Sequence, residues 1–133
     1  MIPNDGNAET AVRKVLDAYT EAVFRADVET LKNIFHPAAV MNGYLGDHLL
    51  VGGPEPFLAD VGGRPAMADS GAPFKTEWTA VHVSGRTATA TLEENGFFGS
   101  GRFVNYFHLL LAGGEWKIVS KTFESLDPAG PVR

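Results

Sequence analysis

The segment from Phe103 to Glu124 constrains the fold more than any other part of the chain, because it has the pattern of one complete β-hairpin. Its sequence, FVNYFHLLLAGGEWKIVSKTFE, contains two apolar stretches separated by Gly113-Gly114. Glycine supplies the positive φ angles that tight two-residue turns need. We therefore expect two long antiparallel strands in which Leu111 lies opposite Trp116.

The same register, continued along both strands, divides the hairpin residues between two faces. The first face is apolar with a small polar group, as the wall of a ligand pocket is. Its members are Asn105, Phe107, Leu109, Leu111, Trp116, Ile118, Ser120 and Thr122. The second face mixes polar and apolar side chains, as subunit interfaces do. Its members are Tyr106, His108, Leu110, Val119, Lys121 and Phe123. The pocket interpretation competes with a structural one, in which the polar residues of the first face satisfy each other and nearby backbone.

The N-terminal half of the sequence predicts helices. Apolar residues recur at three- and four-residue spacing between Asn7 and Ala26, which indicates an amphipathic helix of about five turns. Asp27 is a suitable N-cap for a second, shorter helix that ends at His36-Pro37. A short strand pair follows, with its turn at Gly46-Asp47, and two prolines at 54 and 56 suit the first turn of a third helix.

The middle of the chain predicts a loop and then a second hairpin. Residues 62–73 are rich in Gly, Ala and Pro, and a plain surface connection is favoured over a lid. The stretches FKTEWTAVHV and RTATATLEE turn at Ser84-Gly85, which places Trp78 and His82 with three threonines on a semi-polar face. Glu93-Glu94 reads as a solvated strand end, since neighbours on a strand point to opposite faces.

Helices followed by a mostly antiparallel sheet define an α+β domain. We expect three N-terminal helices packed on a strongly curved sheet, giving a cone-shaped α+β barrel with an apolar cavity at its open end. The length of 133 residues suits one domain spanning 1–133, with flexible tails at 1–6 and 125–133.

Composition and spacing exclude several classes of function. A net charge of −5 without basic clusters disfavours nucleic acid and anionic membrane surfaces as partners. The chain has no cysteine, and its four histidines lack metal-ligand spacing, so no metal is expected. The glycines at 99 and 101 lead into a strand and not a helix, so no phosphate-bearing cofactor is expected either. Without a signal or membrane-spanning pattern, the expected location is cytoplasmic.

Two residues are candidates for chemistry. Tyr19 lies on the buried stripe of the first helix, where it is either a core residue or a phenol at a polar rim. His108 could act as an acid or base near neutral pH, although a hydrogen-bonded interface histidine is the favoured interpretation. We therefore name Tyr19 and His108 as weak catalytic candidates. The predicted ligand-binding residues are Tyr19, Asn105, Phe107, Trp116, Ile118, Ser120 and Thr122.

The sequence resembles the nuclear transport factor 2-like superfamily, whose fold is also called the cystatin-like cone. The order helix, helix, short strand pair, helix and four long strands is similar over nearly the whole chain. Within it, AYTEAVFRADVETLKNIFHPAAVM and FVNYFHLLLAGGEWKIVSKTF look like the lumazine-binding and SnoaL-like branch. The second stretch is the more specific, with its patterns Tyr-x-x-Leu-Leu, Gly-x-Trp-x-Ile-Val and Lys-x-Phe.

The resemblance implies a homodimer joined through the sheets, with a ligand cavity between sheet and helices in each subunit. The superfamily also contains ketosteroid isomerases and polyketide cyclases. Laid against the isomerases, Tyr19 falls where their oxyanion-stabilising tyrosine lies, but their general-base aspartate falls at about Gly43, beside Asn42. Glycine cannot abstract a proton, so isomerisation would need His108 or His82 as the base.

The first functional hypothesis is a small-molecule binding protein whose apolar pocket takes a small apolar or aromatic ligand. The alternative is a cofactor-independent isomerase, cyclase or dehydratase that uses Tyr19 and a histidine. A third is an interaction module that would use the sheet. The missing base at Gly43 favours binding over catalysis.

Overall fold

Apart from one short additional helix, the chain folds into helices and strands in the order that the sequence predicts. The structure is a computed structural model that describes residues 5–71 and 73–126. In chain order its elements are α1 (Asp5–Arg25), α2 (Val28–Ile34), β1 (Phe35–Leu45), β2 (His48–Gly52), α3 (Glu55–Gly62), α4 (Met67–Ser70), β3 (Lys75–Ser84), β4 (Thr87–Phe97), β5 (Gly101–Ala112) and β6 (Glu115–Ser125).

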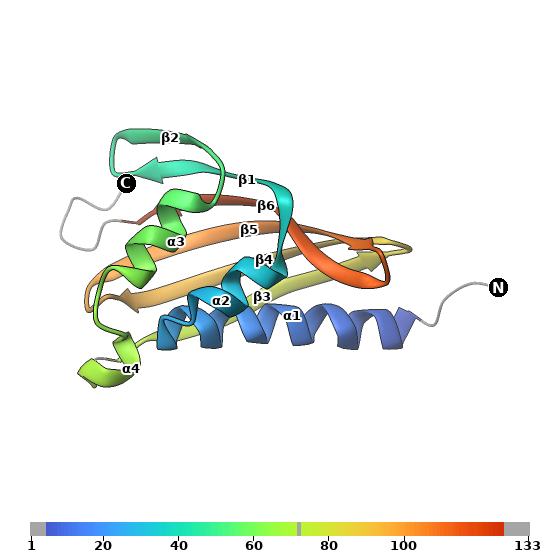
Figure 1. Cartoon of the computed structure of the whole chain (residues 1–133), viewed down its shortest axis with the longest axis horizontal. Helices are drawn as coiled ribbons and strands as arrows, with labels where there is room; N and C mark the ends of the chain where they lie inside the picture. The colour runs from blue at the N-terminus through green and yellow to red at the C-terminus, as the bar shows by residue number, and fades with distance from the viewer. Residues whose placement is uncertain (1–4, 72, 127–133) are drawn as a thin grey trace.

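All the strands of the described residues belong to one six-stranded sheet with the order β2-β1-β6-β5-β4-β3. Strands β1 and β6 pair in parallel, and the other neighbours pair antiparallel. Figure 1 shows a curved sheet with the helices over one of its faces. The predicted α+β fold, with helices packed on a curved and mostly antiparallel sheet, is confirmed.

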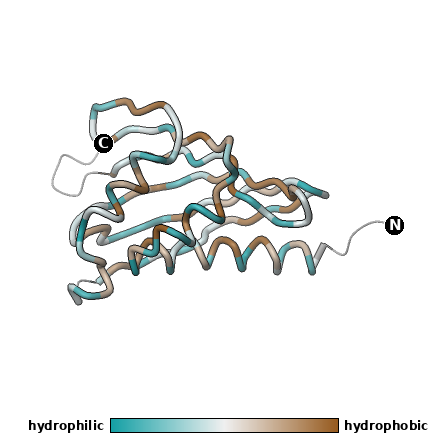
Figure 2. Tube along the Cα trace, in the orientation of Figure 1, coloured by the Kyte–Doolittle hydropathy of each residue, from teal (hydrophilic) through white to brown (hydrophobic). Residues whose placement is uncertain are grey.

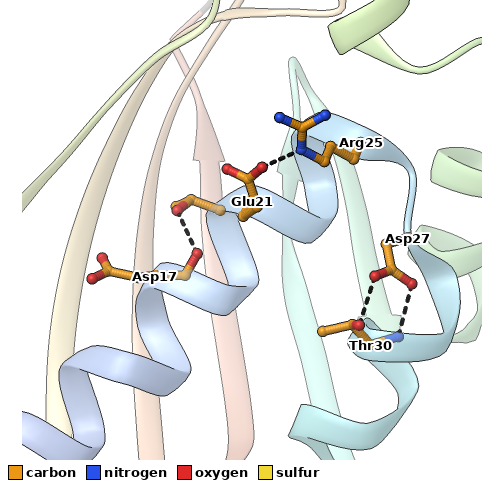
Figure 3. Close-up of polar contacts among 6 residues, drawn as sticks. Asp17, Glu21, Arg25, Asp27 and Thr30 are labelled. Carbon is orange, nitrogen blue, oxygen red and sulfur yellow. Dashed lines mark hydrogen bonds and ion pairs between the residues drawn. The ribbon is translucent and has the colours of Figure 1, made fainter.

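The turn between α1 and α2 follows the predicted capping. Ala26 takes a positive φ of 56°, which ends α1 and redirects the chain. Asp27 then caps α2, because its carboxylate accepts hydrogen bonds from the backbone N–H of Thr30 at 3.2 Å and from the Thr30 hydroxyl at 2.7 Å (Figure 3). These hydrogen bonds lower the pKa of Asp27. In the last turn of α1, Arg25 donates to Glu21 (Figure 3).

The core lies between α1 and the sheet. Figure 2 shows hydrophobic positions recurring along α1, and Val12, Leu16 and Val23 on that stripe are fully buried. Tyr19 lies on the same stripe and packs edge-on against Phe107 with ring centroids 5.0 Å apart. Burial of such side chains contributes roughly 1.5 to 3 kcal/mol each, so this stripe fixes where α1 lies on the sheet.

The Gly- and Pro-rich stretch at 62–73 is not the plain loop that its composition predicts. It contains the short helix α4, and Met67 at its start is buried in the core. The sulfur of Met67 also accepts a hydrogen bond from the backbone N–H of Phe98 at 3.1 Å. One buried anchor therefore ties the stretch to the turn between β4 and β5. Position 72, within the predicted loop, lies outside the described residues.

A β-bulge between Trp78 and Ala80 corrects the predicted face of β3. The predicted pairing is right near the turn, where Val83 lies opposite Ala88. Beyond the bulge, Trp78 faces the core, and its ring lies 5.4 Å from that of Phe107. Because the inserted residue shifts the alternation of side chains by one, Trp78 leaves the semi-polar face on which the sequence pattern placed it.

A second bulge, at Val119, corrects the predicted register of the last hairpin. The turn at Gly113-Gly114 forms as predicted, and Leu111 lies opposite Trp116. The register then shifts between Leu109 and His108, so that residue 107 pairs with Lys121 instead of residue 120. Lys121 and Phe123 therefore point inward, and Ser120 and Thr122 move to the other face.

The predicted tails are shorter than expected at both ends of the described chain. Residues 5 and 6 belong to α1, and residue 125 belongs to β6. The backbone N–H of Leu126 donates to the carbonyl of Arg102 at 2.7 Å. The remainder of the predicted tails, residues 1–4 and 127–133, lies outside the described residues.

Candidate functional site

A cavity of about 370 Å³ lies where the β1–β2 hairpin and α3 face the inner side of β4, β5 and β6. Its volume falls in the usual range for small-molecule sites. Most of its wall is apolar, from Met41, Leu45, Leu50, Val51, Pro56, Phe57, Phe97, Phe103 and Phe123. Asp60 of α3 and Arg64, just beyond that helix, also line the wall, and they form an ion pair at 3.0 Å.

Three polar side chains from the central strands reach this cavity. They are Glu94 of β4, Asn105 of β5 and Lys121 of β6. Their exposed fractions are 6%, 1% and 4%, so all three lie in the interior. The Asn105 amide donates a hydrogen bond from Nδ2 to Oε1 of Glu94 at 2.9 Å. The sheet therefore places a carboxylate, an amide and an amine in one apolar cavity.

Two oxygen atoms of this cluster have no hydrogen-bond partner within the described part of the chain. They are Oε2 of Glu94 and Oδ1 of Asn105, and both atoms are buried from solvent. A buried acceptor without a partner costs roughly 1 to 3 kcal/mol, so such atoms are rare unless something else satisfies them. Because both residues line the cavity, a bound molecule with N–H or O–H groups would supply the missing partners.

Burial dominates the protonation of the cluster. Desolvation raises the pKa of Glu94, although the charge of Lys121 and the hydrogen bond from Asn105 partly oppose that shift. Desolvation lowers the pKa of Lys121 to about 8, against the opposing effect of Glu94. The pKa of Tyr19 is raised well above its usual value, mainly by burial and also by the nearby charge of Glu94. Buried groups with shifted pKa values in a cleft are typical of functional sites.

Aromatic rings surround the Lys121 amine. Its Nζ lies 3.9 Å from the ring centroid of Phe57, 5.3 Å from that of Tyr19 and 5.9 Å from that of Phe123. Such rings attract an ammonium group through their quadrupoles. The rings also hold the long side chain in place and exclude water from it. The amine is thus held at the cavity wall among these rings.

Of the predicted ligand-binding residues, Asn105 is the one that the structure places at the cavity wall. The others from the first face, Phe107, Trp116 and Ile118, are buried in the core with Tyr19. None of these four lines the cavity described above.

The register shift explains the remaining misplaced candidates. Thr122 is exposed, and Ser120 pairs with His108 on the outer side of the sheet. His108 is itself exposed there, which removes it from the cavity. His82 is exposed as well, so the structure brings neither histidine to the buried Tyr19. Conversely, the interface face predicted from the sequence wrongly included Lys121 and Phe123.

Glu94 and Lys121 are the functional candidates that sequence reasoning missed. Glu94 was assigned with Glu93 to a solvated strand end, but Glu94 is buried while Glu93 is exposed. Two acidic residues side by side on a strand do face opposite ways, and that alternation is itself a signal that one of them points inward. For Lys121 the sequence offers a weaker signal, because the bulge at Val119 that turns it inward has no marker residue such as glycine.

The comparisons with known proteins agree with this architecture. Residues 7–124 match the family described as "Putative lumazine-binding". The chain belongs to this family. The match covers every strand almost completely, together with the helices that enclose the cavity. None of the curated proteins matches the chain.

Similar solved structures place this chain within the NTF2-like superfamily. An NTF-2 like protein of unknown function from Silicibacter pomeroyi is 24% identical, with a TM-score of 0.81 over 92% of this chain and 99% of that chain. One from Methylobacillus flagellatus is 28% identical, with a TM-score of 0.76 over 90% and 92%. A "putative dehydratase from the NTF2-like family" of Streptomyces avermitilis is 22% identical, with a TM-score of 0.65 over 92% and 98%.

Gly43 has a structural reason to be glycine in this NTF2-like protein. A Cβ atom at this position would lie 2.1 Å from the carbonyl oxygen of Phe123 and 2.6 Å from its Cγ. No side chain fits where β1 and β6 approach so closely. The cavity does contain a buried carboxylate, but it belongs to Glu94 on β4 and not to position 43 on β1.

Two further observations concern partners. The described residues contain no group of three or more His, Asp or Glu side chains arranged to hold a metal ion. No helix in the described ranges has the length and apolar character needed to cross a membrane.

The lowered pKa of Lys121 predicts a specific dependence of stability on pH. Between about pH 8 and about pH 10.4, the unfolded chain keeps a proton on this lysine that the folded chain has lost. The free energy of unfolding therefore rises with pH across this window, by roughly 1 to 3 kcal/mol. Urea unfolding at pH 8 and pH 10 should show the rise in the wild type and in Lys117→Met.

The variant Lys121→Met should lack this rise. Tyr19, which is buried beside Lys121, and the Asp60–Arg64 pair are present in all three proteins, so their titration does not distinguish the variants. Lys117→Met also keeps the interaction between Glu94 and Lys121 intact. An equal rise in Lys121→Met and in the wild type would contradict the assignment of the shifted amine to Lys121.

Proposed function

We propose that this protein binds a small organic molecule in the cavity, with an apolar or aromatic body and a polar head directed at Glu94, Asn105 and Lys121. The observation that carries the proposal is the pair of unpartnered buried oxygens, Glu94 Oε2 and Asn105 Oδ1, on residues that line a mostly apolar cavity. A protein without a ligand would gain stability by replacing such groups with apolar ones, so their presence here favours binding.

The donors and acceptors of the cluster define the ligand head. Glu94 and Asn105 offer acceptors that match N–H or O–H groups, and the Lys121 ammonium offers donors that match a carbonyl oxygen. The family description names lumazine, a fused heterocycle with ring N–H and carbonyl groups on its edge. A planar head of this kind fits the cluster, and Phe57, Phe103 and Phe123 supply aromatic surface beside it.

A matched pair of ligands tests this proposal. 2-Naphthol and naphthalene share one fused aromatic body, but only 2-naphthol carries an O–H donor. A hydrogen bond to a charged acceptor contributes roughly 1.5 to 3 kcal/mol, so 2-naphthol should bind about tenfold or more tightly than naphthalene. Titration calorimetry or fluorescence would measure both affinities, with lumazine as a third probe.

The adjacent pair Glu93 and Glu94 provides the control. Glu94→Gln should reduce the preference for 2-naphthol, because it removes the negative acceptor while keeping the side-chain shape. Glu93→Gln alters the exposed neighbour on the other face and should leave the preference intact. Equal affinity of the wild type for the two probes would contradict a hydrogen-bonding role for the cluster.

A second candidate function is proton transfer in a cofactor-independent isomerase, cyclase or dehydratase. The observation that favours it is a buried carboxyl, Glu94, whose raised pKa and unpartnered oxygen suit a general acid or base inside a water-poor cavity. Glu94 would then be the general acid or base, a role that Gly43 cannot take because it has no side chain.

Exchange of a carbon-bound proton tests this second function. 2-Tetralone carries acidic protons next to its carbonyl, and NMR in D₂O follows their replacement by deuterium. The wild type and Glu93→Gln should accelerate the exchange above the buffer rate, and Glu94→Gln should lose the acceleration. Exchange that persists unchanged in Glu94→Gln would argue against Glu94 as the base.

We also propose that the protein forms a homodimer through the outer face of its sheet. The helices cover the opposite face (Figure 1), and Tyr106 and Leu110 of β5 are 50% and 40% exposed on the uncovered one. Large exposed apolar side chains in the middle of a sheet are typical of an interface, and a second copy presents the same face.

Sedimentation velocity at micromolar concentration tests the dimer. The wild type should sediment as a dimer, and Leu110→Glu should shift it to a monomer, because an unpaired charge would be buried in the interface. Leu49→Glu, at a still more exposed apolar position on β2, should remain dimeric. A monomeric wild type would overturn the proposal, and a dimer unaffected by Leu110→Glu would place the interface elsewhere.

A further inference from the structure

The Lys121 amine differs from every other lysine of the chain in where it lies. Lys14, Lys32 and Lys75 are exposed, and Lys117 is half-buried while its amine donates to the carbonyl of Asn33. Lys121 alone among these side chains ends at the wall of the cavity. Its amine lies among three aromatic rings, in the same cavity as the Glu94 carboxyl.

We propose that Lys121 forms a reversible covalent imine with a carbonyl group of the cavity ligand, an apolar or aromatic aldehyde or ketone. This inference rests on the proposed binding function and adds the chemical class of the ligand head. A lysine can act as a nucleophile when it lies in an apolar pocket next to a group that moves protons, and the cavity provides both. The apolar wall would hold the body of the ligand while the carbonyl reaches the amine.

The reaction balances with the groups present. The unprotonated Nζ attacks the carbonyl carbon, a C–N bond forms as the C=O π bond breaks, and one proton passes from the nitrogen to the oxygen to give a carbinolamine. Glu94 in its acid form then protonates that hydroxyl, the C–O bond breaks, and water leaves as the C=N bond forms. The nitrogen gives its second proton to the Glu94 carboxylate, which restores the acid. The reverse reaction adds the water back and releases the carbonyl compound and the free amine. No oxidant, reductant or metal is involved.

Opposing effects act on the amine, and burial is the strongest. The aromatic rings and the Glu94 charge both favour the ammonium form, while loss of hydration disfavours it. The outcome is a pKa of about 8 for Lys121. At pH 7 roughly a tenth of such amines are unprotonated, compared with about one in 2500 for an ordinary lysine. This difference makes Lys121 the reactive lysine of the folded chain even after allowance for its lower basicity.

Reductive trapping tests the imine directly. The wild type is incubated at pH 7 with 2-naphthaldehyde and sodium cyanoborohydride, which converts an imine to a stable secondary amine. Peptide mass spectrometry then locates the adduct. Lys121 should be labelled at least tenfold more than Lys75. The aldehyde can also label the α-amino group, which lies in a different peptide and is counted separately. Unfolding in urea should abolish that excess, because the selectivity depends on the cavity.

Two controls separate the imine from simple binding. 2-Naphthalenemethanol has the same body but no carbonyl, so it should bind without a covalent bond and should protect Lys121 from labelling while leaving Lys75 unaffected. Lys121→Arg keeps a cation but has no amine of this kind, and the excess label should vanish. If the alcohol binds and Lys121 is labelled no more than Lys75, the imine is overturned while the binding function stands. If neither probe binds nor labels the cavity, both fail together.

Discussion

The pairing of β5 with β6 determines both the shape of the sheet and the chemistry of its inner face. These two strands form the centre of the sheet, with β1 on one side and β4 on the other. The bulge at Val119 inserts one residue into β6, and the half of the strand beyond it is rotated by one position relative to the half before it. Without the bulge, Lys121 and Phe123 would point outward and Ser120 and Thr122 would face the helices. Lys121 therefore joins Glu94 and Asn105 in the cavity because of one inserted residue.

The cluster is a demanding arrangement for the fold. A carboxylate and an ammonium taken out of water lose hydration that their mutual attraction recovers only in part. Here that loss is visible in the opposite pKa shifts of Glu94 and Lys121, both of which favour the neutral forms. The hydrogen bond from Asn105 satisfies one carboxylate oxygen and leaves the other buried without a partner in the described part of the chain. An arrangement selected for stability alone would satisfy both, and this is why we propose that the cluster serves binding.

The sequence predicted the elements well and the inner face only in part. The helices could be predicted because their apolar spacing and the Asp27 cap are local signals, and the hairpin turns because glycine marks them. The direction of side chains along a strand is not local in this way, since one unmarked bulge reverses every residue beyond it. Asn105 was placed correctly because the bulge lies in the partner strand. Ser120, Thr122 and Lys121 were misplaced because they follow the bulge.

Ligand binding and protonation are linked in such a site. Glu94 and Lys121 interact, so a proton taken up or released by either changes the pKa of the other, and the pair titrates as a unit. A ligand that donates to Oε2 of Glu94 stabilises the carboxylate, and the carboxylate in turn favours the ammonium form of Lys121. A ligand that consumes the amine in a covalent bond has the opposite effect, because Glu94 then loses its positive neighbour and takes up a proton more readily. A noncovalent ligand that donates to Glu94 should therefore favour the charged forms of Glu94 and Lys121, whereas a covalent ligand should favour protonated Glu94. The fold positions these residues, and the bound ligand determines their charge state.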